Sequence, residues 1–226
     1  MNSAARQTDA EFLLFLNNDT EIIEADWLKR MVGFARLPNV GAVGAKLLYP
    51  DQRIQHLGVV LGHEALTGHY FQGEWNEADV MGPLCYKRAV RNVAAVTAAC
   101  LITPRKLFLE TGGFDEVELP VAWNDVDYCL RLLQKGYRVI VDPDVVLIHH
   151  EGVSRGDAKN EREIATMFAR WRPIIEADPF YHPGFAQTGR SFALRGEPAD
   201  VEFPRLYYAR YARKADGVAT AGAGHV

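Results

Sequence analysis

Phe12-Leu13-Leu14-Phe15-Leu16-Asn17-Asn18-Asp19-Thr20 joins an apolar run directly to a polar cluster. The five apolar residues are typical of a fully buried strand. Open α/β sheets bind phosphate-bearing ligands at the carboxyl ends of their strands, which is where the polar cluster would lie. The stretch therefore predicts an α/β sheet with a ligand site at this strand end.

Two further polar clusters stand at the ends of predicted elements. Asn124-Asp125-Val126-Asp127 begins a predicted helix, and His149-His150-Glu151 follows another apolar run. Carboxylate, amide and imidazole groups at three element ends are side chains that a single site could bring together. We expect Asp19, Asp125 and His149 to converge.

The composition is that of a soluble globular protein, with 48% apolar and 24% charged residues among 226. This length predicts one domain with a tail. A formal net charge of −4 offers no basic surface for nucleic acid, so an anionic substrate would need a bound cation or local dipoles.

Three widely spaced cysteines indicate a reducing compartment. No run reaches the ~18 apolar residues that span a bilayer, which predicts a cytoplasmic protein that can associate peripherally with the inner face of the membrane.

The order of apolar and polar residues predicts strands that alternate with helices. The expected strands are 12–16, 40–48, 54–61, 93–102, 137–141 and 145–148, with the turn Asp142-Pro143-Asp144 between the last two. The expected helices are 25–35, 105–110, 124–135 and 157–177. Asn124 or Asp125 can cap the third helix, and Pro173 should bend or break the fourth. Residues 62–87 lack a steady period and predict a long loop.

The candidate ligands suggest a metal site and a base before any family is considered. Asp19 and His149 offer the carboxylate and imidazole groups that bind divalent cations. Asp125, at a helix start, could accept the proton of an attacking hydroxyl. Plainer interpretations stay open: residues 17–20 could form only a turn, Asp125 could be only a helix cap, and Trp123 could be core rather than the floor of a sugar site.

Seven motifs occur in an order that is found in one enzyme family. They are residues 12–20 (FLLFLNNDT), 54–62 (IQHLGVVLG), 95–101 (AVTAACL), 112–116 (GGFDE), 124–132 (NDVDYCLRL), 136–138 (GYR) and 149–156 (HHEGVSRG). With them, the chain resembles the family 2 glycosyltransferases of the GT-A type, in the surface-polysaccharide and O-antigen branch that includes rhamnosyltransferases. The likeness covers residues 3–195, and the number and order of the motifs make it specific.

This resemblance implies an inverting transfer of a sugar from a nucleotide-sugar donor to a saccharide or lipid-linked acceptor, in surface-polysaccharide synthesis. It implies that Asp125 is the catalytic base and that a divalent cation, Mg²⁺ or Mn²⁺, binds at Asp19 and His149, with His149 preferred to His150. Donor and metal contacts would come from Asn17, Asn18, Asp19 and His149. Acceptor contacts would come from Thr97, Ala98, Asp115, Trp123 and Asn124.

The sequence departs from the family's pattern in two places. Asn17 replaces the leading Asp of the common Asp-x-Asp element, and an uncharged amide should bind a metal less tightly. The family's amino-terminal half, which encloses the nucleotide, has no match, so the chain resembles the second half of a catalytic domain. The predicted architecture is a GT-A-like (Rossmann-like) mixed α/β sheet flanked by helices and truncated at its amino terminus.

Residues 1–195 are assigned to this domain with its helical extension, and 196–226 to a further extension with a disordered tail. A rival interpretation is a non-catalytic saccharide-binding remnant or subunit, which needs a partner to supply the nucleotide-binding half. The isolated chain could then be inactive. A nucleotidyltransferase fits less well, because no Gly-rich loop with a basic residue is visible.

Overall fold

The structure, a computed structural model, describes residues 1–63, 66–77, 81–150 and 161–196. Its strands are β1 (Phe12–Leu16), β2 (Thr20–Ile22), β3 (Val40–Leu48), β4 (Ile54–His56), β5 (Val59–Leu61), β6 (Thr67–His69), β7 (Arg91–Asn92), β8 (Cys100–Pro104) and β9 (Arg138–His149). Its helices are α1 (Asn2–Gln7), α2 (Trp27–Ala35), the short 3₁₀ turn η1 (Pro83–Cys85), α3 (Arg105–Glu110), α4 (Asn124–Gln134) and α5 (Glu161–Glu176). None of the helices in these ranges is both long enough and apolar enough to cross a bilayer.

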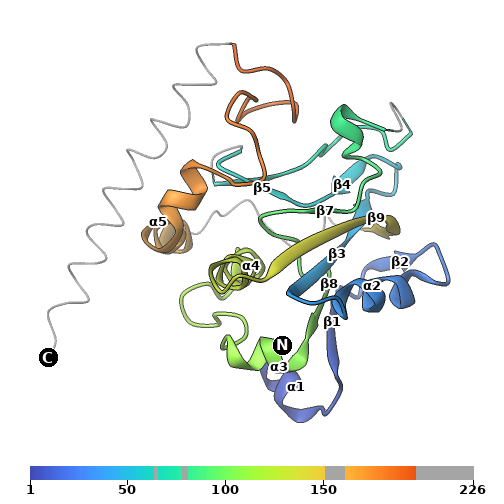
Figure 1. Cartoon of the computed structure of the whole chain (residues 1–226), viewed down its shortest axis with the longest axis vertical. Coiled ribbons are helices and arrows are strands. Elements are labelled where there is room, and N and C mark those ends of the chain that lie inside the picture. The colour runs from blue at the N-terminus through green and yellow to red at the C-terminus, as the bar shows by residue number, and fades with distance from the viewer. Residues whose placement is uncertain (64–65, 78–80, 151–160, 197–226) are drawn as a thin grey trace, which may run out of the picture.

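A mixed sheet forms the centre of the molecule, with strand order β1-β8-β3-β9-β2 (Figure 1). β4 pairs with β3, β7 pairs with β9, and β5 and β6 form a separate hairpin. β3 and β9 run parallel, whereas the other pairings are antiparallel. The predicted mixed α/β sheet is therefore confirmed.

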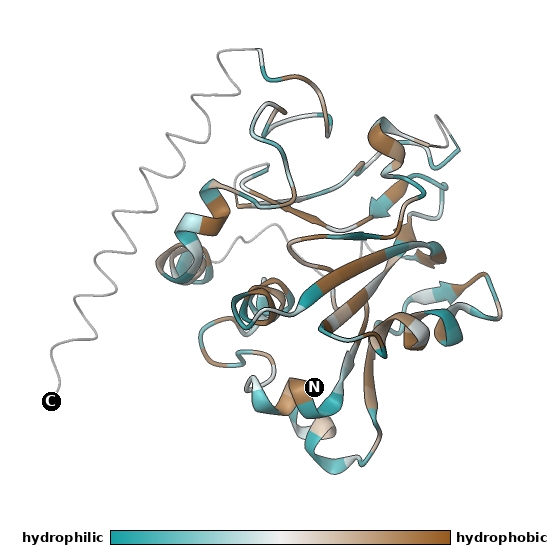
Figure 2. Ribbon diagram, in the orientation of Figure 1, coloured by the Kyte–Doolittle hydropathy of each residue, from teal (hydrophilic) through white to brown (hydrophobic). Residues whose placement is uncertain are grey.

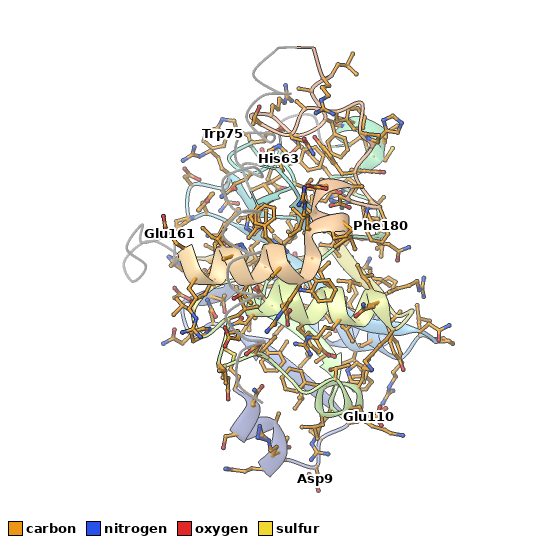
Figure 3. All side chains as sticks on the ribbon, turned by 90° about the vertical axis from the view of Figure 1, so that its left-hand side faces the viewer. Asp9, His63, Trp75, Glu110, Glu161 and Phe180 are labelled. Carbon is orange, nitrogen blue, oxygen red and sulfur yellow. The ribbon has the colours of Figure 1, made fainter. Side chains whose placement is uncertain are left out.

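Helices cover both faces of this sheet. On one face, Met31 of α2 is buried with apolar side chains of β3, β8 and β9. On the other face, the buried side of α4 packs with the larger apolar cluster, to which α5 also contributes. The brown strands at the centre of Figure 2 lie between helices with mixed surfaces. Figure 3 looks onto α5, which runs from Glu161 toward Phe180 and lies beside α4.

β1 is not the fully buried strand that its five apolar residues predict. Leu13 and Phe15 are buried, but Leu16 is 39% exposed. The alternation arises because β1 pairs only with β8 in the described part of the chain, so it is an edge strand there. An apolar run alone does not distinguish a central strand from an edge strand.

β9 is one continuous strand, so the predicted turn at Asp142-Pro143-Asp144 is wrong. These residues form a bulge, because the pairing with β3 shifts register between Ala45, opposite Asp142, and Lys46, opposite Val146. Arg30 of α2 holds the bulge with ion pairs to Asp142 (2.6 Å) and Asp144 (2.8 Å). Proline is tolerated within a sheet at such irregular positions.

Three other predicted boundaries also need correction. The run 54–61 is divided into β4 and β5 by Gly58, whose positive φ of 93° suits glycine. Residues 93–99 are irregular although mostly buried, and the strand resumes at Cys100. The expected loop 62–87 contains β6 and η1. Pro173 lies within α5 without ending it; residues 157–160 and 197–226 lie outside the described residues.

A carboxy-terminal segment, residues 178–195, lies over the β5–β6 hairpin, and we call it the strap (Figure 1). The Leu61 N–H donates to Asp178 Oδ2 (2.8 Å), and the Phe71 N–H donates to Ser191 Oγ (3.1 Å). Burial raises the pKa of Asp178 to about 6, although the N–H groups of Leu61 and Phe180 oppose the rise. The strap therefore holds the hairpin through a carboxyl group with a perturbed pKa.

Asp178 should make the free energy of unfolding depend on pH between about 4 and 6. Its pKa is higher in the folded state than the ~3.9 of the unfolded state, so the stability contribution is complete below pH ~4 and is lost as pH rises through 6. We expect the stability difference between the wild type and Asp178→Asn to change by about 3 kcal/mol over this window. Urea unfolding at several pH values measures it. Asp9→Asn, at an exposed position, is the control, and a flat difference for Asp178→Asn would contradict the assignment.

Candidate active site

Asp19 and His149 meet because β2 pairs with β9. The register sets Thr20 opposite His149, which brings the preceding residue, Asp19, beside the imidazole ring. His149 Nε2 lies 3.2 Å from Asp19 Oδ1 and 3.0 Å from Asn17 Nδ2. His150 instead faces Glu21, at 3.3 Å. The structure thus brings three of the predicted donor and metal residues together at the end of β1.

Gln55 of β4 determines which nitrogen of His149 carries the proton. The His149 carbonyl oxygen accepts the Gln55 Nε2–H (3.4 Å), which leaves Gln55 Oε1 to accept the His149 Nδ1–H (2.7 Å). A neutral His149 therefore has an unprotonated Nε2, which accepts an N–H of the Asn17 side-chain amide and also faces Asp19. A bare nitrogen and a carboxylate oxygen at this distance repel each other unless a proton or a cation lies between them.

This pair fits a divalent cation by its chemistry. Carboxylate and imidazole are common ligands, and metal-binding histidines usually donate their other N–H to a carbonyl oxygen, as His149 does to Gln55. Within the described ranges, no three His, Cys, Asp or Glu side chains are grouped as a complete metal site. Mg²⁺ often binds one or two protein ligands and completes its shell with water and substrate phosphates, so a pair of ligands is compatible with it.

Asp125 lies at the start of α4 but does not cap it as predicted. The capping residue is Trp123, whose φ of 57° is in the left-handed region, and no side chain caps the helix. Asp125 Oδ2 instead accepts the Ala98 N–H (2.9 Å), and its Oδ1 accepts the N–H of Val126 (2.8 Å). The half-buried carboxylate is therefore fixed in orientation by two backbone donors.

A short segment connects Asp125 to the Asp19 cluster. Ala98 donates to Asp125, and the next residue, Ala99, accepts the backbone N–H of Asn17 (3.0 Å) through its carbonyl oxygen. The Asp125 carboxylate and the Asn17 backbone thus both contact the segment that leads into β8, at the end of β1. The contacts place the two predicted halves of the site side by side, while the roles of the residues stay predictions.

The remaining predicted acceptor residues divide into two groups. Thr97, Trp123 and Asn124 flank the Ala98–Asp125 contact in sequence and are all half-buried. Asp115 instead accepts the N–H groups of Val117 and Glu118 and a guanidinium N–H of Arg170 (2.7 Å). Burial opposes these contacts, but together they lower the pKa of Asp115. Its contacts are thus with the residues that follow it and with Arg170 of α5, and its acceptor role stays a prediction.

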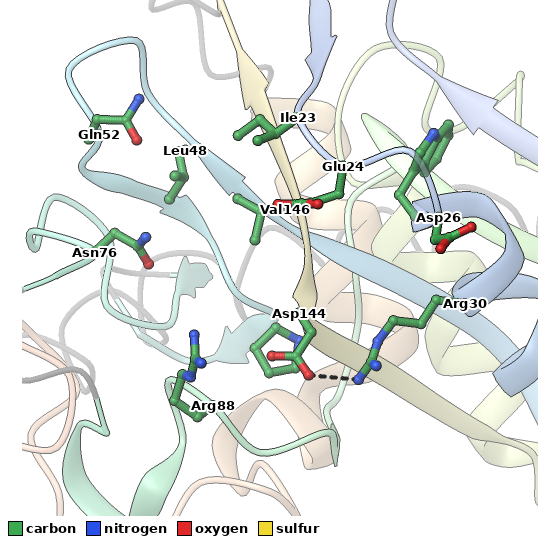
Figure 4. A pocket seen from close by; sticks show the side chains of 12 residues that line it. Ile23, Glu24, Asp26, Arg30, Leu48, Gln52, Asn76, Arg88, Asp144 and Val146 are labelled. Atoms are coloured by element: carbon green, nitrogen blue, oxygen red, sulfur yellow. Dashed lines mark hydrogen bonds and ion pairs between the residues drawn. The ribbon is translucent and has the colours of Figure 1, made fainter.

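A cavity recorded in the described residues lies away from Asp19, His149 and Asp125. It has a volume of about 460 Å³ and lies between α2 and the bulge of β9 (Figure 4). Five charged residues line it together with uncharged side chains: Glu24, Asp26, Arg30, Arg88 and Asp144. A second cavity, of about 380 Å³, lies beside Asp115.

Sequence reasoning missed several residues that position this site. Gln55 holds His149, Thr67 accepts the indole N–H of Trp123 (3.0 Å), and His56 contacts His69 with 2.6 Å between their Nδ1 atoms. The only signal was that Gln55 and His56 belong to the second motif. Nothing in a single sequence indicates which distant side chains they contact.

The curated relatives agree with the motifs. No family model matches the chain. It is 41% identical over 206 residues to the O-antigen biosynthesis protein RfbC of Myxococcus xanthus, covering 89% of the chain and 16% of that protein. It is also 41% identical over 203 residues to the uncharacterized protein y4gI of Sinorhizobium fredii, covering 85% and 22% respectively. The chain thus spans about a fifth of the length of these two relatives.

A more distant relative is named for a specific enzymatic activity. The chain is 27% identical over 175 residues to the N-acetylglucosaminyl-diphospho-decaprenol L-rhamnosyltransferase of Mycobacterium tuberculosis, covering 73% of the chain and 54% of that protein.

Two solved structures have the same fold. The mannosyltransferase PcManGT of Pyrobaculum calidifontis, in complex with GDP-Man and Mn²⁺, matches with a TM-score of 0.51 and 18% identity over 98% of the chain and 57% of its own. GalNAc-T7, with UDP, GalNAc and Mn²⁺, matches with a TM-score of 0.55 and 11% identity over 93% of the chain and 40% of its own. The chain therefore has the GT-A fold, and it is similar in sequence to an O-antigen biosynthesis protein and to an L-rhamnosyltransferase, as its motifs predicted.

Proposed function

We propose that the chain is the metal- and acceptor-binding half of an inverting family 2 glycosyltransferase that acts in surface-polysaccharide synthesis. One observation carries the proposal: the segment 97–99 joins the Asp125 carboxylate to the Asn17–Asp19–His149 cluster at one sheet end. The proposed base and the proposed cation site would thus be adjacent, which supports a sugar transfer from a nucleotide donor.

Asp125 would accept the proton of an acceptor hydroxyl. As that oxygen forms a bond to the anomeric carbon, the bond from this carbon to the diphosphate oxygen of the donor breaks, and the nucleotide leaves on the opposite face. The N–H groups of Ala98 and Val126 hold the carboxylate in place before the acceptor arrives, so little reorganisation is needed. This geometry suits a base that acts on one hydroxyl.

Asp19 and His149 would hold the cation, with the amide groups of Asn17 and Asn18 nearby on the donor side. When bound, Mg²⁺ or Mn²⁺ would neutralise the charge that develops on the departing diphosphate. Gln55 keeps His149 Nε2 available by accepting the opposite N–H. The net charge of −4 makes such a cation valuable, because the chain has no excess of positive charge to bind a diphosphate.

The donor and acceptor follow from the relatives as proposals. A nucleotide-activated rhamnose and an N-acetylglucosaminyl diphospholipid are the first candidates, because the named rhamnosyltransferase is one of the relatives. Further strands would have to supply the nucleotide pocket. The edge of β1 opposite β8, which has no partner strand among the described residues, could accept such a strand from the same or another chain. A cytoplasmic location at the inner face of the membrane would suit a lipid-linked acceptor.

Transfer should require a divalent cation. We expect full-length protein supplied with dTDP-rhamnose and an N-acetylglucosaminyl diphospholipid to yield a product one deoxyhexose heavier by mass spectrometry. Chelation should lower the rate at least about a hundredfold, because the metal supplies several kcal/mol of charge stabilisation, and added Mn²⁺ should restore it. Undiminished transfer in the presence of a chelator would contradict the metal assignment, and a screen of donors without any product would contradict the enzyme assignment.

The same assay also tests whether Gln55 supports metal binding. Gln55→Leu should raise the Mn²⁺ concentration for half-maximal rate about tenfold, because the Gln55 side chain orients the His149 ring. Gln72→Leu removes an exposed glutamine from the surface and should leave this concentration unchanged.

A further inference from the structure

Two basic side chains converge beside the cavity between α2 and the β9 bulge (Figure 4). Lys46 of β3 pairs with Val146 of β9, so the two side chains leave the same face of the sheet, and Val146 lines the cavity. Lys46 is 2% exposed, and its ammonium donates to Oδ1 of Asn76 (3.2 Å), which also lines the cavity. Arg88 lines the cavity from an exposed position. One buried and one exposed cation thus adjoin the same space.

Lys46 is a buried cation without a counter-ion among the described residues. Its ammonium donates to the uncharged Asn76 amide and forms no ion pair there. Asp144 attracts it at longer range, but that carboxylate is already paired with Arg30 (2.8 Å). Buried charges are normally paired, because removing them from water is costly. The ammonium therefore leaves an uncompensated positive charge beside the cavity.

Neighbouring cations add to this local charge. Burial lowers the pKa of Lys46 to about 8, and the positive charge of Arg88 adds to this shift, as do those of Lys87 and Arg91. Lys87 is paired with Glu74 (3.0 Å), whereas the Arg88 side chain has no hydrogen bond or ion pair with any described residue. Lys46 and Arg88 are thus two cations that no described carboxylate neutralises, in a chain whose formal net charge is −4.

The Asn76 amide adds an oriented donor to the two charges. An ammonium group can only donate, so its contact turns Oδ1 of Asn76 toward Lys46 and leaves the Nδ2 N–H groups for another acceptor. The backbone N–H of Asn76 donates to the Gln52 carbonyl oxygen (3.3 Å), which holds this residue at the cavity wall. In Figure 4, Gln52, Asn76 and Arg88 lie on one side of the cavity, whereas Asp26 lies on the other. The N–H donors are thus grouped on the wall away from Asp26.

We propose that this cavity binds a phosphate monoester, whose phosphate group contacts Arg88 and Asn76 while Lys46 balances its charge through Asn76. A phosphate monoester carries nearly two negative charges at neutral pH, which matches the two uncompensated cations, whereas a carboxylate would balance only one. Glu24 and Asp26, which also line the cavity, only accept hydrogen bonds when ionised and therefore suit hydroxyl groups of the ester. The site does not depend on the proposed sugar transfer, because none of its residues belongs to the candidate active site.

Arg88→Gln should raise the dissociation constant about tenfold or more, because a hydrogen bond to a charged group is lost. NMR titrations of the chain at low ionic strength, with inorganic phosphate, β-glycerophosphate and glucose 1-phosphate as probes, measure the effect. Arg138→Gln removes an exposed arginine outside the cavity lining and should bind each probe as the wild type does. Failure of the wild type to bind any of the three probes, or equal binding by Arg88→Gln, would overturn the proposal.

Lys46→Met separates a ligand site from a purely structural role. Methionine is long, apolar and uncharged, so the loss of an unpaired buried cation should not lower the free energy of unfolding in phosphate-free buffer. Saturating glucose 1-phosphate should raise the Tm of the wild type, because a ligand that binds only the folded state stabilises it, and should raise that of Lys46→Met much less. Lower stability of Lys46→Met together with an undiminished effect of the ligand would contradict the proposal.

The pKa of Lys46 tests the proposal on the unaltered protein. A bound phosphate favours the protonated ammonium, so saturation with glucose 1-phosphate should raise this pKa above its value of about 8, as followed by NMR of the lysine side chain. Since the two equilibria are linked, the affinity for the ligand should fall as pH rises through 8. An unchanged pKa at saturation would overturn the proposal even if both variants fail to fold.

Discussion

Asp125→Asn should lower the rate of sugar transfer about 10²- to 10⁴-fold in the full-length protein, the usual contribution of a general base. The amide cannot take the proton of the acceptor hydroxyl. It retains one oxygen, which can accept the N–H of either Ala98 or Val126, so the position of α4 should change little. Rates of product formation at saturating donor, followed by mass spectrometry, measure the loss.

Two controls make the outcome specific to the chemistry. Donor affinity, measured by calorimetry, should be largely unchanged, because Asp125 is assigned to the acceptor rather than to the diphosphate. Asp9→Asn removes an exposed carboxylate and should transfer sugar at the wild-type rate. Survival of more than about a tenth of the rate in Asp125→Asn would exclude this residue as the base.

The elements that local patterns specify were predictable from the sequence. α3 follows Pro104 and α4 ends before Gly136, as proline and glycine at these positions indicate. β3, whose nine residues are all buried, was predicted with its observed limits. Each of these assignments depends on residues within a few positions of one another.

The errors in the predicted fold have a common physical cause. The turn predicted at Pro143 is part of β9, because Arg30 of a distant helix holds the bulge through two carboxylates. β6 escaped prediction because its three residues form a strand only by pairing with β5. Contacts between distant segments decide these cases, and propensity does not contain that information.

In the candidate site, too, some residues could be predicted from local patterns and others could not. Its polar residues were predictable because they interrupt apolar patterns, as Asp19 does after β1. Their supporting partners were not, because neither Gln55, in a predicted strand, nor Thr67, in a predicted loop, has a local signal that points to its contact with His149 or Trp123. A single sequence therefore indicates candidate reactive groups more readily than the side chains that orient them.

Asp127 lies two residues after Asp125 in the sequence. Unlike Asp125→Asn, its substitution should strongly lower the stability of the protein. Its carboxylate is fully buried and accepts from Arg131 Nε (2.8 Å), Trp171 Nε1 (2.8 Å) and an Arg170 guanidinium N–H (3.2 Å). Asp127→Ala would leave the Trp171 N–H unpaired and Arg131 without its counter-ion. We expect the free energy of unfolding to fall by about 3 to 5 kcal/mol, the cost of breaking a buried ion pair, as measured by urea unfolding.

An exposed ion pair of the same helical spacing provides the comparison. Glu110→Ala removes the partner of Lys106 at the surface of α3 and should cost no more than about 0.5 kcal/mol. Asp127→Ala should reduce transfer only as far as the protein unfolds, whereas Asp125→Asn should reduce transfer in a protein that remains folded. A loss below about 1 kcal/mol for Asp127→Ala would mean that α4 is held against α5 by apolar packing alone. The first turn of α4 thus carries one carboxylate, Asp127, that anchors the helix, and one, Asp125, that we propose acts on the acceptor.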